Sequence, residues 1–499
     1  MHEKSKFDKV LGQKDILVIA FGAMIGWGWV INSGDWLTNA GVLGALLAFL
    51  IGGAMVIFVG FTYAELTSAM PKCGGEHVFS YAAMGAKGSF VCTWAIVLGY
   101  VATAAFEAAA LPTVVRYIFG DGFMVGHMYN IGDTPIYASY VAVGSVMAII
   151  ITLVNLRGIK TAAVLQSVLT AIIAIAGLLL IGASVVRGDI SNITSNLFAG
   201  SSEGLGLSTK TMVGGILTVT CMTPFLFVGF DVIPQAAEEI KVAYKKIGSI
   251  MLFSICLAIA WYLLIVFAVS YVMPESAITE SMANGLVTAD AMARAFNSDA
   301  MANVLIIGGM CGIITSWNSF LIGGSRAMFS MAESKMLPGI FAKLHPKYKT
   351  PTAAILLCGV ACFIAPFFGK PVLIWLVDAA SFGCCVAYFM VSVSFVILRR
   401  TKPDMPRPYK VPHGELIGKI AIVLSGFLTL LYVVPLPFAS SALVWQEWIV
   451  VGVWIALGFG FYLYSKAKYG SEFADNMPVE TVAEEPQTAK AHAAMHKAI

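Results

Sequence analysis

The chain has 499 residues, of which 59% are hydrophobic and only 12% are charged. A soluble protein carries roughly 25% charged residues, so this composition excludes an ordinary soluble fold and indicates a surface that mostly faces lipid. The apolar residues occur in runs such as 168–186 and 249–272, and a helix of about 20 residues crosses a hydrocarbon core of roughly 30 Å. Lipid offers the backbone no hydrogen bonds, so we predict an all-α integral membrane protein. The net charge of +3 gives no reason to expect a nucleic acid partner.

Taken in chain order, the apolar runs predict about twelve membrane spans, at 16–41, 43–70, 88–119, 136–155, 161–186, 212–237, 248–273, 301–331, 352–368, 372–398, 418–438 and 442–465. With the N-terminus in the cytoplasm, 26 of the 31 Lys and Arg residues fall on the cytoplasmic side and five fall outside. The opposite orientation would reverse this ratio, so the positive-inside rule predicts that both termini are cytoplasmic. We expect a multi-pass protein of the cell membrane (plasma or inner), and the sequence gives no indication of its oligomeric state.

No long polar linker divides the predicted spans, so we expect one membrane domain at 16–465, preceded by a cytoplasmic segment at 1–15. The polar, Ala-rich tail at 466–499 is expected to be cytoplasmic and disordered. The longest external connection is 274–300, and the pattern at Thr288–Phe296 predicts a short helix within it. That connection is read equally well as a lid over a binding site and as an ordinary covering loop.

Two predicted spans carry residues that weaken a helix at a similar depth in the membrane. The first span has three glycines within Gly22–Gly28, and the sixth has a proline, a glycine and a carboxylate within Thr223–Asp231. Backbone groups freed by such residues are tolerated in a membrane only where they line a cavity. Paired interruptions in corresponding spans of two halves are typical of an inverted-repeat transporter with its site at the midplane. The alternative is that these small residues only allow close helix packing.

Several stretches of the chain resemble the amino acid–polyamine–organocation superfamily of permeases, over about residues 12–465. The stretches that carry the resemblance are IGWG at Ile25–Gly28, YAELTSAMPKCGGEHVFSYAAMG at Tyr63–Gly85, VGFDVIPQAAEEIK at Val228–Lys241 and SRAMFSMAESKMLP at Ser325–Pro338. The resemblance implies the leucine-transporter fold, with a 5+5 inverted repeat and two extra C-terminal helices. The two repeats would then occupy about 16–186 and 212–398, and the extra helices 418–465.

The resemblance also implies where a substrate binds. In similar permeases the substrate carboxylate meets backbone amides at the break in the first span, where a half-helix N-terminus favours an anion. The substrate amine meets carbonyl groups freed at both breaks. The matching substrate-binding positions are Ile25, Gly26, Trp27, Gly28, Phe225, Val228 and Gly229, with Phe225 also in the place of an aromatic gate. One departure is Trp27, because the family usually has a small residue between the two glycines; we expect a reshaped cavity.

Acidic residues within the predicted spans form a second set of candidates, because an ionised group inside a bilayer is costly unless it is paired or hydrated. Glu107 in the third span could neutralise a substrate amine, carry a proton or make a structural hydrogen bond. Asp231 directly follows the break in the sixth span, and we expect it to act in coupling or gating. Asp35 and Glu65 lie near span ends, where we expect an interfacial group and a cytoplasmic contact respectively.

The coupling ion is left open by the sequence. In some related proton-coupled permeases, a lysine in the fifth span stands in for sodium, and the span at 161–186 has no basic residue. This leaves room for Na⁺, with Thr315, Ser316 and Ser319 as oxygen ligands, although such hydroxyls often bond their own helix instead. Proton coupling or exchange through Asp231 or Glu107 is an equal alternative. No organic cofactor and no resident metal are expected.

Other classes of function fit the sequence less well. An intramembrane enzyme would need a nucleophile beside a base, but the chain has no GxSxG, HExxH or P-loop motif, and its histidines fall in predicted loops or tails. A channel favours pore-lining repeats rather than two unlike broken helices. We therefore predict a secondary active transporter, not an enzyme, that moves amino acids by alternating access with ion coupling or exchange. The alternatives are an amine or polyamine transporter or exchanger, and a sensor built on the same scaffold.

Overall fold

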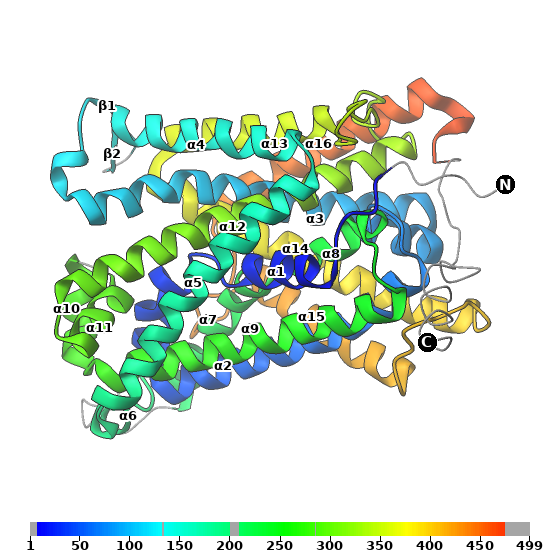
Figure 1. Ribbon diagram of the computed structural model, residues 1–499. Helices are drawn as coiled ribbons and strands as arrows, with labels where there is room; N and C mark the ends of the chain where they lie inside the picture. Colours follow the sequence, from blue (N-terminus) through cyan, green and yellow to red (C-terminus); the bar gives the residue numbers. More distant parts are fainter. Residues whose placement is uncertain (1–6, 132–133, 200–208, 285, 475–499) are drawn as a thin grey trace, which may run out of the picture.

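The computed structural model describes residues 7–131, 134–199, 209–284 and 286–474, and most of them are helical (Figure 1). The predicted spans correspond to α1 (Gln13–Met24), α2 (Gly28–Ala69), α3 (Glu76–Phe119), α4 (Ala138–Leu156), α5 (Ile159–Arg187), α7 (Thr209–Phe227), α9 (Tyr244–Val272), α12 (Asp299–Glu333), α13 (Thr352–Ile364), α14 (Gly369–Thr401), α15 (Gly414–Val433) and α16 (Trp445–Tyr469). Shorter elements are β1 (His127–Ile131), β2 (Thr134–Tyr137), α6 (Ile190–Ser195), α8 (Val232–Gln235), α10 (Glu275–Asn284) and α11 (Val287–Phe296). The predicted all-α membrane architecture is confirmed.

Among the described residues, ten helices are long and apolar enough to cross a membrane. The longest of them are interrupted by glycines. In α2, Gly41 has a φ of 70°, and a Cβ at this position would lie 2.5 Å from the backbone of Phe198. Only glycine fits such a conformation and such an approach. The interruption divides α2 into the outer part of the first predicted span and the whole of the second.

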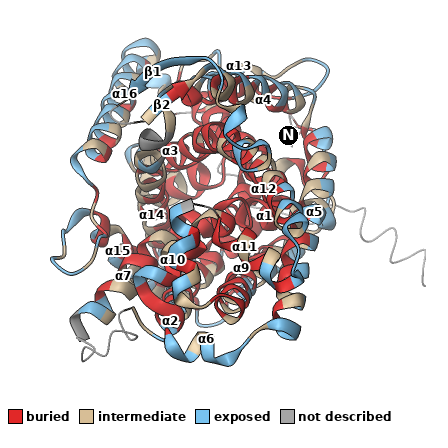
Figure 2. Cartoon of the chain, turned by 90° about the vertical axis from the view of Figure 1, so that its left-hand side faces the viewer, coloured by how far each residue is buried: buried red, intermediate tan, exposed pale blue. Residues whose placement is uncertain are grey.

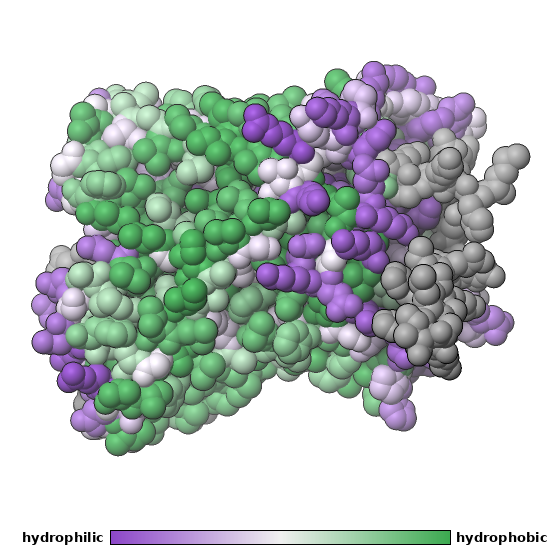
Figure 3. All heavy atoms as spheres, in the orientation of Figure 1, coloured by the Kyte–Doolittle hydropathy of each residue, from purple (hydrophilic) through white to green (hydrophobic). Residues whose placement is uncertain are grey.

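Hydrophobic residues form a broad band across the face that Figure 3 shows, and hydrophilic residues gather at its two ends. We call one end the basic end: there α1 begins, α2 and α14 finish, and Arg326, Arg399 and Arg407 lie close to acidic partners. The opposite end carries the β1–β2 hairpin, α6, α10 and α11 (Figure 1), and we call it the hairpin end. An apolar band between two polar ends is the pattern expected of a protein that spans a bilayer.

Three features of the two ends differ from expectation. The short helix expected at Thr288–Phe296 is present as α11, but α10 precedes it and was not expected. The β1–β2 hairpin before α4 was not predicted, and its second strand takes up the first two residues of the span predicted at 136–155. At the basic end α3 begins at Glu76, twelve residues before the predicted span, and is kinked at Gly85. His77 was assigned to a loop, and this was wrong. It is buried in the added segment, where its ring contacts the hydroxyls of Thr93, Ser89 and Ser334.

The domain boundaries expected at the two termini fall partly outside the described residues. Before α1, the Val10 and Leu11 amides both donate to the Glu239 carbonyl, so this segment is attached to the bundle. At the other terminus α16 continues to Tyr469, and the Ala474 amide donates to the Ser334 carbonyl. Residues 475–499, which make up most of the tail that we expected to be disordered, lie outside the described residues.

The core of the bundle is built from the longest helices. Figure 2 views the hairpin end and shows buried residues gathered along the helices at the centre, with exposed residues around the rim. The helix α3 packs along α14 and α12, and α2 packs along α9 and α7. The helix α12 in turn packs along α5 and α1. Of the two helices that end mid-bundle, α1 lies between α9 and α12, and α7 lies against α2 and α14.

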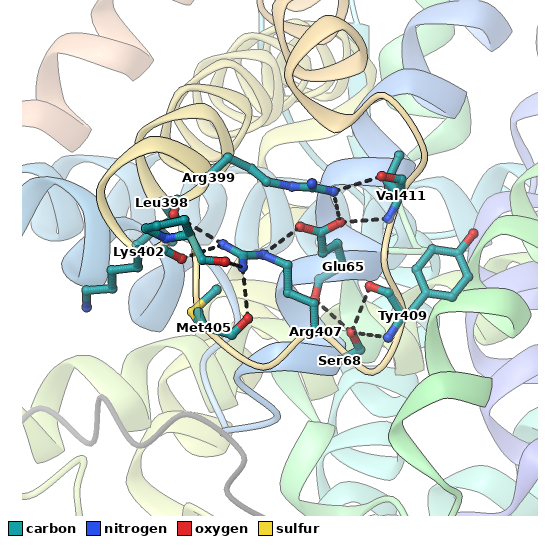
Figure 4. Close-up of polar contacts among 10 residues, drawn as sticks. Glu65, Ser68, Leu398, Arg399, Lys402, Met405, Arg407, Tyr409 and Val411 are labelled. Carbon is teal, nitrogen blue, oxygen red and sulfur yellow. Dashed lines mark hydrogen bonds and ion pairs between the residues drawn. The ribbon is translucent and has the colours of Figure 1, made fainter.

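A buried ionic cluster fastens the basic end of α2 to the segment between α14 and α15 (Figure 4). The Glu65 carboxylate accepts from Arg399 at 2.5 Å, pairs with Arg407 at 3.0 Å and accepts from the Val411 amide at 2.7 Å. Arg407 also donates to the carbonyls of Leu398 and Lys402 at the end of α14. The Glu65 side chain is only 1% exposed, so its charge depends on these partners. The expected contact of Glu65 near the span end is therefore an ion-pair network.

The Glu65 cluster yields a prediction for stability. Replacing Glu65 with Ala leaves two arginines beside an empty, buried site, and breaking a buried pair costs about 3 kcal/mol or more. We expect Glu65→Ala to lower the melting temperature of the purified protein in detergent clearly. The matched control is Glu415→Ala, which removes a carboxylate with side-chain exposure of 49% that contacts Arg400 and Lys419. Such exposed pairs contribute about 0–1 kcal/mol, so equal melting temperatures for both variants would contradict the prediction.

Candidate functional site

The first helix break lies at Ile25–Trp27, between α1 and α2, as the glycine pattern predicted. In the described structure the amides of Gly26 and Trp27 donate to no backbone carbonyl. The carbonyl of Gly22 would receive the Gly26 amide in a continuous helix, but instead accepts the Thr315 hydroxyl at 3.0 Å. The break therefore leaves two amide donors near the N-terminus of α2, where the helix dipole favours an anion.

The second break lies at Val228–Asp231, between α7 and α8, again at the predicted position. Gly229 has a φ of 141°, a conformation that side chains rarely adopt. Its amide donates to the Oδ1 atom of Asp231 at 2.8 Å, and its carbonyl accepts the Val232 amide at 3.2 Å. The carboxylate of Asp231 thus closes a turn in place of the helical hydrogen bond.

The two breaks face each other. A Cβ on Gly229 would lie 2.6 Å from the Cβ of Ala23 and 3.1 Å from the Met24 amide nitrogen. On the other side, a Cβ on Gly28 would lie 2.4 Å from a methyl carbon of Leu226. The two breaks are therefore in close contact, at Gly229 with Met24 and at Gly28 with Leu226. The structure thus brings together the residues predicted in the first and sixth spans.

The hydroxyl of Tyr262 on α9 joins both breaks, and sequence reasoning missed it. It lies 2.5 Å from the Met24 carbonyl oxygen and 3.2 Å from the Leu226 carbonyl oxygen, the last turns of α1 and α7. Tyr262 is fully buried. A hydroxyl within an otherwise apolar span was a signal of this role, because a buried hydroxyl needs a partner.

The helix α12 forms a third wall of the site. A Cβ on Gly26 would lie 2.9 Å from the Cβ of Ser316, so the break passes directly over this serine. Besides its bond to Gly22, Thr315 contacts the Gly312 carbonyl at 2.9 Å, and Ser319 donates to the Ile19 carbonyl at 3.2 Å. The three residues named as sodium ligands thus line the junction of α12 with α1, and two of them donate to carbonyls there.

Glu107 and Phe225 approach the same region from α3 and α7. The ring of Phe225 meets Phe106 edge to face, with centroids 5.5 Å apart, and Glu107 is the next residue along α3. The Ser316 hydroxyl is a hydrogen-bond partner of Glu107, while the Oε2 atom of Glu107 has no partner in the described structure. Glu107 is 2% exposed. A buried carboxylate with an unpartnered oxygen is suited to bind a cation.

The two tryptophans of the first break point into neighbouring helices. The ring of Trp27 packs on Gly309 of α12, where a Cβ would lie 2.3 Å from it. The indole of Trp29 donates to the Ile25 carbonyl at 3.2 Å and meets Trp261 edge to face. Trp27 and Trp29 are both buried. The Trp27 side chain, which is larger than the residue expected at this position, therefore fits because α12 has Gly309 opposite its ring.

Two helices interrupted opposite each other inside an apolar helical bundle are typical of one class of protein, the membrane transporters. The comparisons agree. Residues 11–461 match the family model described as amino acid permease. The chain therefore belongs to the amino acid permease family, as its resemblance to the superfamily predicted.

Curated relatives align over most of their length. The chain is 25% identical over 470 residues to the branched-chain amino acid permease BcaP of Bacillus subtilis (strain 168), covering 93% of this chain and 94% of the relative. It is 24% identical over 480 residues to the methylthioribose transporter of the same organism, covering 92% and 94%. It is 22% identical over 441 residues to the aspartate-proton symporter of that organism, covering 86% and 80%. These relatives are transporters rather than enzymes.

The contact between the two breaks can be tested at Gly229. We expect Gly229→Ala to abolish transport and lower the melting temperature, because a Cβ would collide with Ala23 and the positive φ costs about 1–3 kcal/mol. The matched control is Gly182→Ala on α5, where nothing lies within 4 Å of the added Cβ. Melting and uptake measurements on both variants check the prediction. Uptake by Gly229→Ala at the level of Gly182→Ala would contradict it.

Proposed function

We propose that this chain is a secondary active transporter that moves amino acids across the membrane by alternating access. The observation that carries the proposal is the pair of facing breaks, which leaves the Gly26 and Trp27 amides without backbone partners inside the bundle. These donors suit a carboxylate, and the carbonyls at Met24 and Leu226 suit an ammonium group. The family match and relatives named for amino acids support this reading.

A cationic amino acid or an amine is the second candidate substrate. It is favoured by Glu107, whose Oε2 atom is buried without a partner beside Ser316. A relative named for methylthioribose supports a family in which the substrate class varies between members. The wall formed by Glu107 and Phe225 is therefore the part of the site that we expect to select among substrates.

Coupling is proposed to run through Asp231, either by proton symport or in exchange. The Asp231 carboxylate accepts the Gly229 amide at 2.8 Å and the Tyr388 hydroxyl at 3.1 Å. The backbone conformation at the second break therefore depends on whether Asp231 is ionised. A relative named as a proton symporter supports this choice. The alternative is Na⁺ at the α1–α12 junction, where the Thr315 hydroxyl lies near the carbonyls of Gly22 and Gly312.

The location of the protein follows from the same reading. We propose that it lies in the cell membrane with its basic end in the cytoplasm, because most of its Lys and Arg residues gather on that side. Both termini would then be cytoplasmic. A panel of amino acids and amines, offered to proteoliposomes with and without sodium and a pH gradient, tests substrate and ion together. No flux of any of these compounds would refute the proposed function.

The role of Glu107 is tested by Glu107→Gln. The amide keeps the shape but loses the charge, so we expect uptake of cationic substrates at low concentration to fall by about tenfold or more, with neutral amino acids much less affected. Competition against a radiolabelled neutral amino acid measures both classes in one preparation. Glu280→Gln, an exposed change on α10, is the control. An equal effect on neutral and cationic substrates would remove Glu107 from substrate selection.

The role of Asp231 is tested by Asp231→Asn. If this carboxyl carries the coupling proton, wild-type uptake rises as the external pH falls, because the protonated form is then loaded from outside. We expect the variant to insert normally but to lose gradient-driven uptake at every pH. The control is Asp404→Asn, an exposed aspartate at the basic end. Wild-type uptake by Asp231→Asn across the pH range would exclude this role.

A further inference from the structure

A second buried carboxylate, Glu76, is connected to Asp231 through α8 and lies within its electrostatic reach. Glu76 begins α3 and, like Asp231, is fully buried. The amide of Gln235, on α8, donates to its Oε2 atom. Gln235 follows Asp231 by four residues, so the short α8 carries Asp231 near one end and the partner of Glu76 at the other.

Close backbone packing fixes Glu76 in this place. The turn before α3 contains Gly74 and Gly75, with φ values of 100° and 37°. The Gly74 amide donates to the Gln235 carbonyl at 3.3 Å, and a Cβ on Gly75 would lie 2.8 Å from Pro234. The start of α3 therefore packs directly against α8. The Glu76 side chain is buried there and does not reach solvent.

The surroundings of the two carboxylates contain hydroxyls but no cation in contact. Tyr388 donates to Asp231, and the rings of Tyr63 and Tyr388 meet edge to face at 5.9 Å. Neither Glu76 nor Asp231 makes an ion pair within the part of the chain that the structure describes. The titratable and charged groups that face the pair or lie next to it come from α2, α3, α8 with the turn after it, α12 and α14: Tyr63, Glu65, His77, Cys92, Tyr100, Glu238, Glu239, Arg326, Cys384 and Tyr388.

The basic groups near this cluster are committed elsewhere. Arg326 pairs with Glu239 at 2.6 Å, and Arg399 and Arg407 pair with Glu65. The two ring nitrogens of His77 face the hydroxyls of Thr93, Ser89 and Ser334. Among the described residues, therefore, neither carboxylate has a cation as its ion-pair partner, and the two lie within electrostatic reach of each other.

Four buried polar atoms around the pair have no hydrogen-bond partner in the described structure: Glu76 Oε1, Gln235 Oε1, Tyr63 Oη and Tyr100 Oη. Two of these atoms are carbonyl or carboxylate acceptors, and the other two are tyrosine hydroxyls, which can donate as well as accept. A proton on Glu76 would provide a donor at this point, and it would also remove the repulsion between two buried negative charges. Two ionised carboxylates without cations are costly in a dry interior, and such pairs hold a shared proton instead.

We propose that Glu76 and Asp231 form a single proton-binding site, in which the pair takes up one proton on a carboxylate oxygen and releases it during the transport cycle. This proposal rests on the proposed function and identifies the coupling ion as H⁺. Asp231 has the donors that favour its ionised form, namely the Gly229 amide and the Tyr388 hydroxyl. Glu76 is the member with an unpartnered oxygen, and it holds the proton while Asp231 is ionised.

The decisive variant is Glu76→Gln, which imitates a permanently protonated Glu76. In proteoliposomes we expect the ratio of proton-driven accumulation to substrate exchange to fall by about tenfold or more. We also expect proton-driven accumulation to depend less steeply on pH. Glu76→Asp keeps an acid and should retain coupling with a shifted pH profile. In the double variant Glu76→Gln/Asp231→Asn, the loss should be no greater than with Asp231→Asn alone, because the two residues act as one unit. Glu280→Gln controls for the removal of an exposed carboxylate.

A second readout does not depend on transport. Infrared difference spectra recorded across a pH titration of the reconstituted protein should show the carbonyl band of a buried carboxylic acid, lost in Glu76→Gln and retained in Glu280→Gln. Wild-type coupling in Glu76→Gln, or accumulation by the wild type that needs sodium and moves no protons, would overturn the proton site while leaving the transporter intact. If the wild type moves no amino acid or amine, the proposed function fails. The infrared band alone then shows whether Glu76 binds a proton.

Discussion

The backbone groups released at the two helix breaks need hydrogen-bond partners, and the rest of the site is arranged around this need. In a bilayer an unsatisfied backbone group costs several kcal/mol, and water is not available to replace the lost helical bond. The carbonyls on the α1 and α7 sides are held by hydroxyls: Thr315 bonds Gly22, and Tyr262 reaches both Met24 and Leu226. These bonds join α1 and α7 to α12 and α9. The amides of Gly26 and Trp27 have no backbone partner in the described structure, and they are the donors that we propose for a substrate.

Sequence patterns were sufficient for the parts of the structure that depend on local chemistry. Apolar runs predicted the spans, and glycine and proline predicted both breaks, because these residues act on the backbone of their own segment. Patterns failed where the cause lies in distant packing. The helix that begins at Glu76 depends on Gly75 meeting Pro234, and nothing near His77 in the sequence indicates burial against Ser334. The inverted repeat stays a prediction, supported by the correspondence of the two breaks.

The same distinction applies to the candidate site. Gly26, Gly28, Phe225 and Gly229 were named because their segments resemble those of the family, while the breaks themselves follow from the glycines and the proline in those segments. Tyr262 could not be placed, because its role requires the ends of α1 and α7 to meet at one point on α9. The tryptophan that departs from the family pattern shows the same dependence. Trp27 fits because α12 offers Gly309 opposite its ring, a pairing over a sequence distance that no local pattern spans.

The acidic groups Glu107 and Asp231 lie on opposite sides of the second break. Only Asp231 is bonded to the backbone of the break itself. Glu107 lies on the side of Ser316 and Phe225, next to the place proposed for substrate. Asp231 lies on the side of α8, and its Oδ1 atom holds the amide of Gly229. A carboxylate accepts such a bond more strongly than a carboxylic acid does. Transfer of the proton of the proposed Glu76–Asp231 site from Glu76 to Asp231 would therefore loosen the turn at Gly229, the residue that rests on Ala23 and Met24 of the first break. In the transport cycle that we propose, this transfer changes the contact that shapes the donors at the first break.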